Sequence, residues 1–205
     1  NGFLPAVHQG SLIYPENAEP LNNVRPRETD AEQRSRLELI GDLDDAFVDR
    51  VGGDRQVEAA IDNYEIAYRM QTAVPELVDL SGETVATKQM YGMESPNPST
   101  VAYGRQCLVA RRLVERGVRF VELTMVGTDG MGQAANPWDQ HTKLIEGHSA
   151  NALTVDQPVA GLVKDLKSRG LLDETLVIFS GEFGRTPFVQ GTNGRDHNPY
   201  GFSLW

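Results

Sequence analysis

Two short apolar runs constrain the fold of this 205-residue chain most strongly. Residues 118–126, VRFVELTMV, have the β-branched and aromatic content of a strand. Residues 175–180, TLVIFS, form a continuous apolar run typical of a strand buried on both faces of a parallel sheet. Each run follows a helical pattern, one over about residues 100–117 and one that ends at Gly170. This alternation predicts an α/β domain.

The front half of the chain predicts helices instead. Residues 1–28 are rich in Pro, Asn and Gly and are expected to be a connector, and residues 29–98 a mainly helical region that starts at the capping residue Thr29. Residues 99–205 are the expected α/β region, and the last strand-like run, 201–205, ends without a terminating signal. We therefore predict one incomplete domain: part of a doubly wound, mostly parallel sheet flanked by helices, with a helical insertion in its front half.

Charge and cysteine content exclude several classes of protein. The formal net charge of -10 disfavours nucleic acid as a partner, because a grip on phosphate backbones needs clustered Lys and Arg. Cys107 is the single cysteine, so a metal site here must use carboxylates, imidazoles or carbonyls, and Cys107 itself is expected in the core. The sequence contains no run of eighteen or more apolar residues, so it predicts no membrane span.

Polar side chains follow the predicted strands. Asp139 and His141 lie in the loop after residue 126, Glu182 follows the run 175–180, and Asp196 with His197 precedes the last strand. In open α/β sheets, ligands bind beyond the carboxyl ends of the strands, so these residues are expected to meet in one crevice. Carboxylate oxygen with imidazole nitrogen suits Zn or Mn better than Ca or Mg.

Each of these residues also has an ordinary structural interpretation. Asp139 is compatible with a helix N-cap followed by an exposed His141, Glu182 with a solvated carboxylate paired to Arg185, and Asp196 with a turn former beside His197. On the functional interpretation, bound cations would activate water and stabilise the oxyanion of a phosphate or sulfate ester. Arg185 is then a possible contact for the anion.

Four stretches resemble a known family. GFLP near the start, WDQH at 138–141, LVIFSGEFGRTP at 176–187 and GRDHNPYGFSLW at 194–205 are similar to the sulfatase-like family catalogued as domain of unknown function 1501. That family is grouped with the alkaline phosphatase and sulfatase superfamily. The resemblance implies a doubly wound sheet whose strand ends hold one or two metal ions.

The resemblance also implies roles for single residues. Asp139 and His141 match the Asp and His that serve one metal, Glu182 matches the acid after a central strand, and His197, with Asp196 beside it, matches a later His. In the superfamily that acid is often followed by His, where this chain has Phe183. The superfamily's nucleophile lies beside the first strand, which this chain lacks, so the catalytic nucleophile is expected outside it.

The sequence thus leads to two functional hypotheses. The first is a metal-dependent hydrolase of phosphate or sulfate esters, with a small anionic ester as substrate and this chain as the carboxyl-proximal part of its catalytic domain. The second is a catalytically inactive, exported binding or surface-assembly protein on the same scaffold. The resemblance implies a periplasmic or extracellular location for either.

Overall fold

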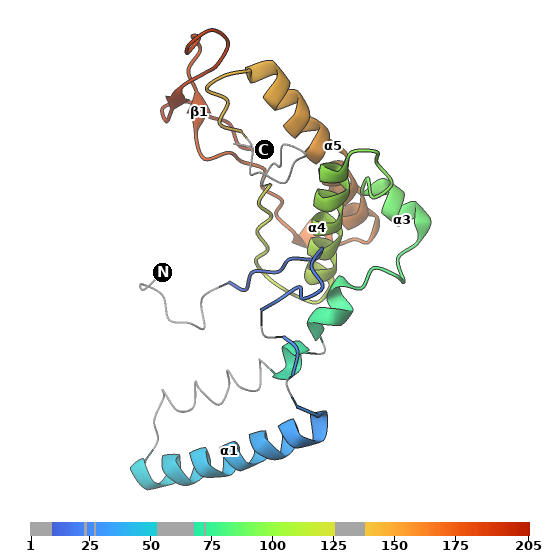
Figure 1. The fold of residues 1–205 in the computed structure, drawn as a ribbon, viewed down its shortest axis with the longest axis vertical. Helices are drawn as coiled ribbons and strands as arrows, with labels where there is room; N and C mark the ends of the chain where they lie inside the picture. Colours follow the sequence, from blue (N-terminus) through green and yellow to red (C-terminus); the bar gives the residue numbers. More distant parts are fainter. Residues whose placement is uncertain (1–9, 23, 27, 53–67, 72, 126–137) are drawn as a thin grey trace. The chain divides into compact units, whose positions relative to one another are not determined.

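The structure is a computed structural model that describes residues 10–22, 24–26, 28–52, 68–71, 73–125 and 138–205. Two compact units compose it, Asn1–Leu80 and Ser81–Trp205. The expectation of a single domain with internal boundaries at residues 28 and 98 stays a prediction. Within the described ranges, none of the helices combines the length and the apolar character of a membrane span. The elements are α1 (Asp30–Val51), α3 (Val85–Met90), α4 (Pro98–Glu115), α5 (Leu144–Ser168), the 3-10 helix η2 (Leu172–Glu174), β1 (Gly184–Arg185) and β2 (His197–Asn198) (Figure 1).

Helix α1 of the first unit begins and ends where its sequence predicts. The Thr29 hydroxyl accepts the Glu32 N–H at 3.3 Å, and the Glu32 carboxylate accepts the Thr29 N–H at 2.9 Å, which makes a capping box. At the other end, Gly52 takes the left-handed conformation with φ 78°. Glycine adopts that conformation without the steric cost of a Cβ atom, so the helix stops there.

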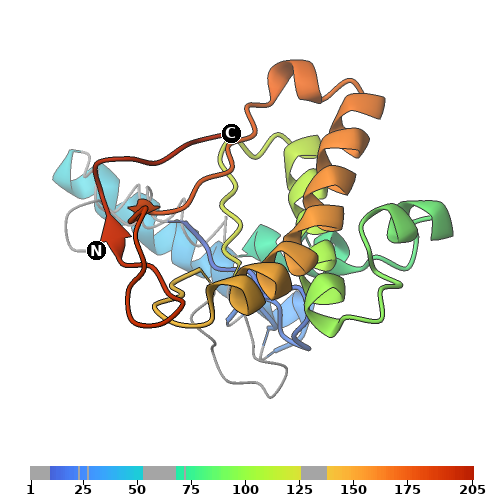
Figure 2. The same ribbon diagram turned by 90° about the horizontal axis from the view of Figure 1, so that it is seen from above.

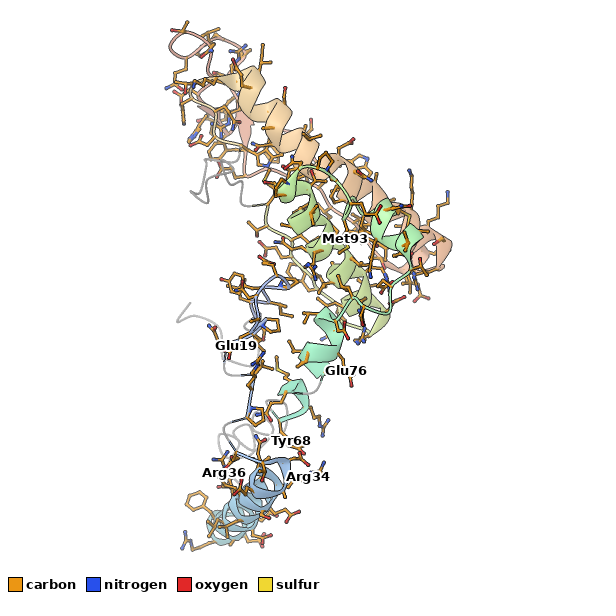
Figure 3. The ribbon with its side chains drawn as sticks, turned by 45° about the vertical axis from the view of Figure 1, so that its right-hand side comes forward. Glu19, Arg34, Arg36, Tyr68, Glu76 and Met93 are labelled. Carbon is orange, nitrogen blue, oxygen red and sulfur yellow. The ribbon has the colours of Figure 1, made fainter. Side chains whose placement is uncertain are left out.

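Tyr68 joins α1 to a helical segment later in the same unit. Its hydroxyl donates to Asp30 Oδ1 at 2.7 Å, and the Arg34 guanidinium lies 5.8 Å from the centre of the Tyr68 ring (Figure 3). Residues 68–71 and 73–78 are helical. Most of the second helix predicted for residues 55–72 lies outside the described residues.

The core of the second unit lies between α4 and α5, which run side by side (Figures 1 and 2). The predicted helix over 100–117 is confirmed as α4, and the predicted helix ending at Gly170 is confirmed as α5, although α5 begins earlier, at Leu144. Cys107 is fully buried, as expected. The buried apolar residues are Tyr91, Tyr103, Cys107, Leu108, Val109, Ala110, Val155, Leu162 and Leu166.

Two helical glycines let the backbone before α4 approach this helix pair. A Cβ atom on Gly104 would lie 2.1 Å from the Tyr91 carbonyl oxygen, and one on Gly161 would lie 2.6 Å from the Met90 carbonyl oxygen. Real Cβ contacts are longer than 3.0 Å. The two helices therefore hold the chain at Tyr91 directly against their own backbones, and the Tyr91 side chain is fully buried.

A network of charges is buried beside Tyr91. Arg111, 3% exposed, donates to Glu83 at 2.7 Å and to Glu115 at 2.5 Å. The Arg111 Nε lies 3.0 Å from Asp165 Oδ2 without hydrogen-bond alignment. Asp165 accepts instead from the Tyr91 hydroxyl at 3.0 Å. Burial opposes the charge on Arg111, but the bonds to Glu115 and Glu83 outweigh it and raise the Arg111 pKa.

The predicted fold class is wrong. Among the described residues the sheet is β1 paired with β2, two antiparallel strands, and residues 118–125 and 175–180 form no strand. Leu176 is 84% exposed and Ile178 is 64% exposed. A doubly wound sheet requires strands paired on both edges and covered on both faces. In the described part of the chain the run 175–180 has one point of backbone pairing, where Phe179 and Trp205 exchange hydrogen bonds at 2.5 and 3.0 Å, and neither run is covered on both faces. Their β-type composition alone therefore does not make a sheet.

Candidate metal centre

The first part of the candidate site lies just before α5. The helix begins at Leu144, and the residue before it, Lys143, takes a left-handed conformation with φ 52°. Asn193, from a distant turn, satisfies this helix end: its side-chain Oδ1 accepts the Lys143 N–H at 2.9 Å, and its carbonyl accepts the Leu144 N–H at 3.1 Å. Asp139 is therefore not the N-cap of α5, and the segment that holds Asp139 and His141 is tied to residues 190–194.

The second part is a hairpin whose strands are β1 and β2. Their register places Arg185 opposite His197 and Gly184 opposite Asn198. The pairing continues where the Thr186 N–H donates to the Asp196 carbonyl at 2.9 Å. Arg185 and His197 therefore come from adjacent positions on neighbouring strands.

The turn between these strands docks onto the segment before α5. Gln190 and Gly194 exchange backbone hydrogen bonds, both at 3.0 Å, and the Arg195 N–H donates to the Gln140 carbonyl at 3.1 Å. A Cβ atom on Gly194 would lie 1.8 Å from the His141 carbonyl oxygen. Only glycine permits that approach, so the sequence Gln-Gly-Thr-Asn-Gly at 190–194 allows the hairpin to lie against His141.

The result is a cluster of three possible ligands: Asp139, His141 and His197. The His197 Nε2 lies 2.7 Å from Asp139 Oδ1, and the His141 Nε2 lies 2.9 Å from the same oxygen. The two Nε2 atoms are 3.1 Å apart. All three side chains are partly open to solvent, between 28% and 43% exposed, so a cation can reach them.

Asp139 is the electrostatic centre of this cluster. Its Oδ1 also accepts from Arg185 at 2.5 Å, and Arg185 donates further to the Trp138 carbonyl at 3.1 Å. The hydrogen bond from His197, followed by that from Arg185, holds the Asp139 pKa well below its usual range. Asp139 therefore stays ionised, which is the form that binds a metal.

The donor set fits a divalent transition metal. Zn and Mn accept imidazole nitrogen together with carboxylate oxygen, and the cluster offers two of the first and one of the second. Ligand atoms around a tetrahedral cation with bonds of about 2.0–2.1 Å stand about 3.3 Å apart. The three separations here are 2.7, 2.9 and 3.1 Å, so these atoms would need to move apart by a few tenths of an ångström to hold such a cation.

The structure does not bring all the predicted ligands together. The Glu182 side chain is 65% exposed, lies 3.8 Å from Arg185 and is not a member of the cluster. Asp196 is also outside it: its Oδ1 lies 3.9 Å from His141 Nδ1, on the side of the ring that faces away from Asp139. Roles for these two acids as metal ligands stay predictions.

Sequence reasoning missed two residues that build the site, Gln190 and Asn193. The Gln190 Oε1 lies 2.5 Å from His141 Nδ1, and Asn193 caps α5. The Asn193-Gly194 pair is a turn signal that was available in the sequence. It predicts a turn but not the segment on which that turn docks.

Phe183 fills the space beside the cluster. Its ring centre is 4.5 Å from that of His197, and the Arg185 guanidinium lies 5.8 Å from the Phe183 ring. Phe183, at the position where the superfamily often has His, thus packs its apolar ring against His197. It contributes no ligand atom.

Comparison with known proteins identifies the family and little else. No curated protein and no solved structure shows a significant match to the chain. The family model described as "Protein of unknown function (DUF1501)" matches residues 1–205. The chain therefore belongs to the DUF1501 family.

Proposed function

We propose that this chain carries the metal-binding part of a hydrolase that cleaves phosphate or sulfate esters. The observation that supports this is the convergence of Asp139, His141 and His197, which lie 56 or more residues apart between the two segments and bring three donor atoms to one point. Polar side chains whose only role is contact with solvent are not expected to place two imidazoles around one carboxylate. A solvent-accessible group of this kind is a candidate for catalysis.

In the proposed site Asp139, His141 and His197 hold the metal, with Zn or Mn preferred to Ca or Mg. When bound, such a metal lowers the pKa of a coordinated water and draws charge from an ester oxygen. Asp139 supplies the negative charge of the site. The two imidazoles supply neutral nitrogen donors and leave the net charge of the centre positive, which favours an anionic substrate.

Arg185 is the residue proposed to contact that substrate. Its guanidinium is paired with Asp139, and Glu182 lies 3.8 Å away on the open side. With a cation bound at Asp139, the Arg185 guanidinium would be repelled and would compete for the same oxygen. Arg185 can then turn towards the solvent side, where its fork of N–H groups suits the oxygens of a phosphate or sulfate.

Metal analysis of the purified full-length protein tests the proposal. After expression with added Zn and Mn, elemental analysis is expected to find about one equivalent of metal or more in the wild-type protein. His197→Ala and Asp139→Asn are expected to lose it. Asp156→Asn, an exposed acid on α5, is the matched control and is expected to keep it. Absence of metal from the wild-type protein would reject the proposed site.

A non-catalytic role is the second candidate. Phe183 packs against His197 and Glu182 lies outward, which leaves the cluster with three possible ligands among the described residues. This is compatible with an exported binding or surface-assembly protein. Assays of the full-length protein with aryl phosphates and aryl sulfates separate the two. Turnover that His197→Ala abolishes supports the hydrolase, and metal binding without turnover of either ester class supports the binding protein. Fractionation of cells tests the proposed periplasmic or extracellular location.

A further inference from the structure

The two nitrogens of His141 face different surroundings. On the Nδ1 side, the Gln190 Oε1 lies at 2.5 Å and the Asp196 Oδ1 at 3.9 Å, and both are acceptor oxygens. On the Nε2 side lie Asp139 Oδ1 at 2.9 Å and His197 Nε2 at 3.1 Å. A neutral imidazole carries its proton on one nitrogen and offers a lone pair on the other. The surroundings therefore decide which nitrogen can bind a metal.

The two possible positions of the His141 proton leave different numbers of unfavourable contacts. With the proton of His141 on Nδ1, that N–H donates to Gln190 Oε1, and the Nε2 lone pair accepts from the Nε2–H of His197, which also donates to Asp139. The one unfavourable contact is then between the His141 Nε2 lone pair and Asp139 Oδ1 at 2.9 Å, two acceptors that a bound cation would bridge. With the proton on Nε2, the His141 Nδ1 lone pair would face the Gln190 oxygen at 2.5 Å. The two Nε2–H groups would also confront each other at 3.1 Å. The second arrangement lets the His141 Nε2–H donate to Asp139 Oδ1 at 2.9 Å, but it has two repulsive contacts against one in the first.

We propose that Gln190 is a positioning residue that holds the proton of His141 on Nδ1 and so directs the Nε2 lone pair to the metal. This inference rests on the proposed metal site and names the residue that prepares it. Outer-shell acceptors of this kind fix the tautomer and the ring orientation of a metal-binding histidine. Asp196 adds a negative charge on the same side of the ring, which is a different role from the ligand role predicted for it.

The backbone around Gln190 is built to keep this acceptor in place. Gln190 and Gly194 exchange two backbone hydrogen bonds, and Gly194 lies against the carbonyl of His141 itself. Asn193 of the same turn fixes the start of α5, three residues after His141. The acceptor and the imidazole are thus parts of one docked structure. A change confined to the Gln190 side chain leaves the backbone pairing available.

Nuclear magnetic resonance of the full chain tests the inference without metal. Nitrogen-15 labelling of histidine at alkaline pH, where imidazoles are neutral, distinguishes a protonated Nδ1 from a protonated Nε2. The wild-type protein is expected to show His141 protonated on Nδ1. A wild-type His141 protonated on Nε2 would overturn the proposal, and this measurement needs no variant.

Three variants separate positioning from general stability. Gln190→Met removes the oxygen acceptor at similar length and is expected to shift His141 towards the Nε2 proton and to weaken Zn binding by about 10- to 100-fold. Gln190→Glu restores an acceptor and is expected to keep both properties. Thr192→Val, in the same turn, is the matched control and is expected to match the wild type. An unchanged tautomer in a folded Gln190→Met protein would overturn the proposal.

The two proposals fail in different ways. If the wild-type protein binds neither Zn nor Mn in a calorimetric titration, the metal function is rejected, and the tautomer in wild type and Gln190→Met still decides whether Gln190 orients the ring. If the metal binds and the tautomer shifts, but Gln190→Met keeps wild-type Zn affinity, the positioning role towards the metal is rejected. Circular dichroism and thermal unfolding confirm that each variant folds.

Discussion

Removal of the Asp165 carboxylate is expected to destabilise the second unit strongly. Asp165 is 3% exposed and accepts from the Tyr91 hydroxyl at 3.0 Å and from Arg169 Nε at 2.7 Å. In Asp165→Ala the buried Tyr91 hydroxyl loses its acceptor, which costs about 1–3 kcal/mol. The bond from Arg169 contributes about 1 kcal/mol or less, because that side chain is 38% exposed.

The rest of the expected loss of stability in Asp165→Ala depends on Arg111. Its Nε loses the carboxylate at 3.0 Å, but its other nitrogens keep Glu83 and Glu115 at 2.7 and 2.5 Å. Removal of one partner of a buried ion pair costs about 3–5 kcal/mol when the remaining charge has no other partner. Because Arg111 keeps two carboxylates, its own contribution is expected to be below that range, and the total loss, with those of Tyr91 and Arg169, is about 3 kcal/mol in the free energy of unfolding.

Urea unfolding followed by circular dichroism measures this change. Asp165→Asn keeps an oxygen acceptor for Tyr91 and is expected to cost about half as much as Asp165→Ala. Asp156→Asn, an exposed acid on the same helix, is the control and is expected to change stability by less than about 0.5 kcal/mol. If Asp165→Ala unfolds within about 0.5 kcal/mol of the wild type, the buried network does not stabilise the α4–α5 core.

Three further changes test other parts of the structure. Gly194→Ala is expected to weaken Zn binding more than 100-fold, because a Cβ atom 1.8 Å from the His141 carbonyl oxygen must displace the turn, and metal–ligand distances tolerate changes of about 0.2 Å. Gly181→Ala serves as control in the titration, because a Cβ atom there would make only an ordinary contact, 3.9 Å from the Phe183 carbonyl oxygen. Lys143→Gly is expected to stabilise the protein by about 1 kcal/mol in thermal unfolding, since φ is 52° there, and a loss of stability would contradict this. Burial raises the pKa of Cys107 to about 12 from 9.0, so its thiol is expected to react with a disulfide reagent at pH 8 only after unfolding. Above pH 9 the thiol loses its proton in the unfolded state but not in the folded state, so the free energy of unfolding is expected to fall as the pH rises towards 12. Cys107→Ala is expected to show a smaller fall.

The helices could be predicted from the sequence because their signals are local. The start of α1 depends on Thr29 and Glu32, three residues apart, and its end on Gly52. The apolar positions of α4 recur within one helix face, with Cys107 among them. A strand has no comparable local sequence signal that ensures its formation. The runs 118–126 and 175–180 have β-type composition, but a sheet exists only where other segments supply backbone partners and cover, and local sequence does not contain that information.

Asp139, His141 and His197 could be singled out because the chemistry of a metal ligand restricts the residue type. Their distances could not be predicted, since they depend on where the turn 190–194 docks. The same limit explains Glu182. It was placed at a strand end of a sheet, but β1 begins two residues after it, and its side chain points to solvent at 65% exposure.

The cluster therefore does not need the parallel sheet that suggested it. One carboxylate and two imidazoles come within 3.1 Å of one another through three local features. These are the two-residue strands β1 and β2, Gly194, which lets the turn contact the His141 carbonyl, and Asn193, which caps α5. Asp139, His141 and His197 were predicted to meet from an incorrect premise about strand ends; the structure brings their side chains together, and their role as metal ligands stays a prediction. The segment before α5 and the hairpin are joined by docking contacts from the turn, at Gly194 and Asn193. The assembly of the site is thus expected to depend on that turn more than on any strand-forming run in the chain.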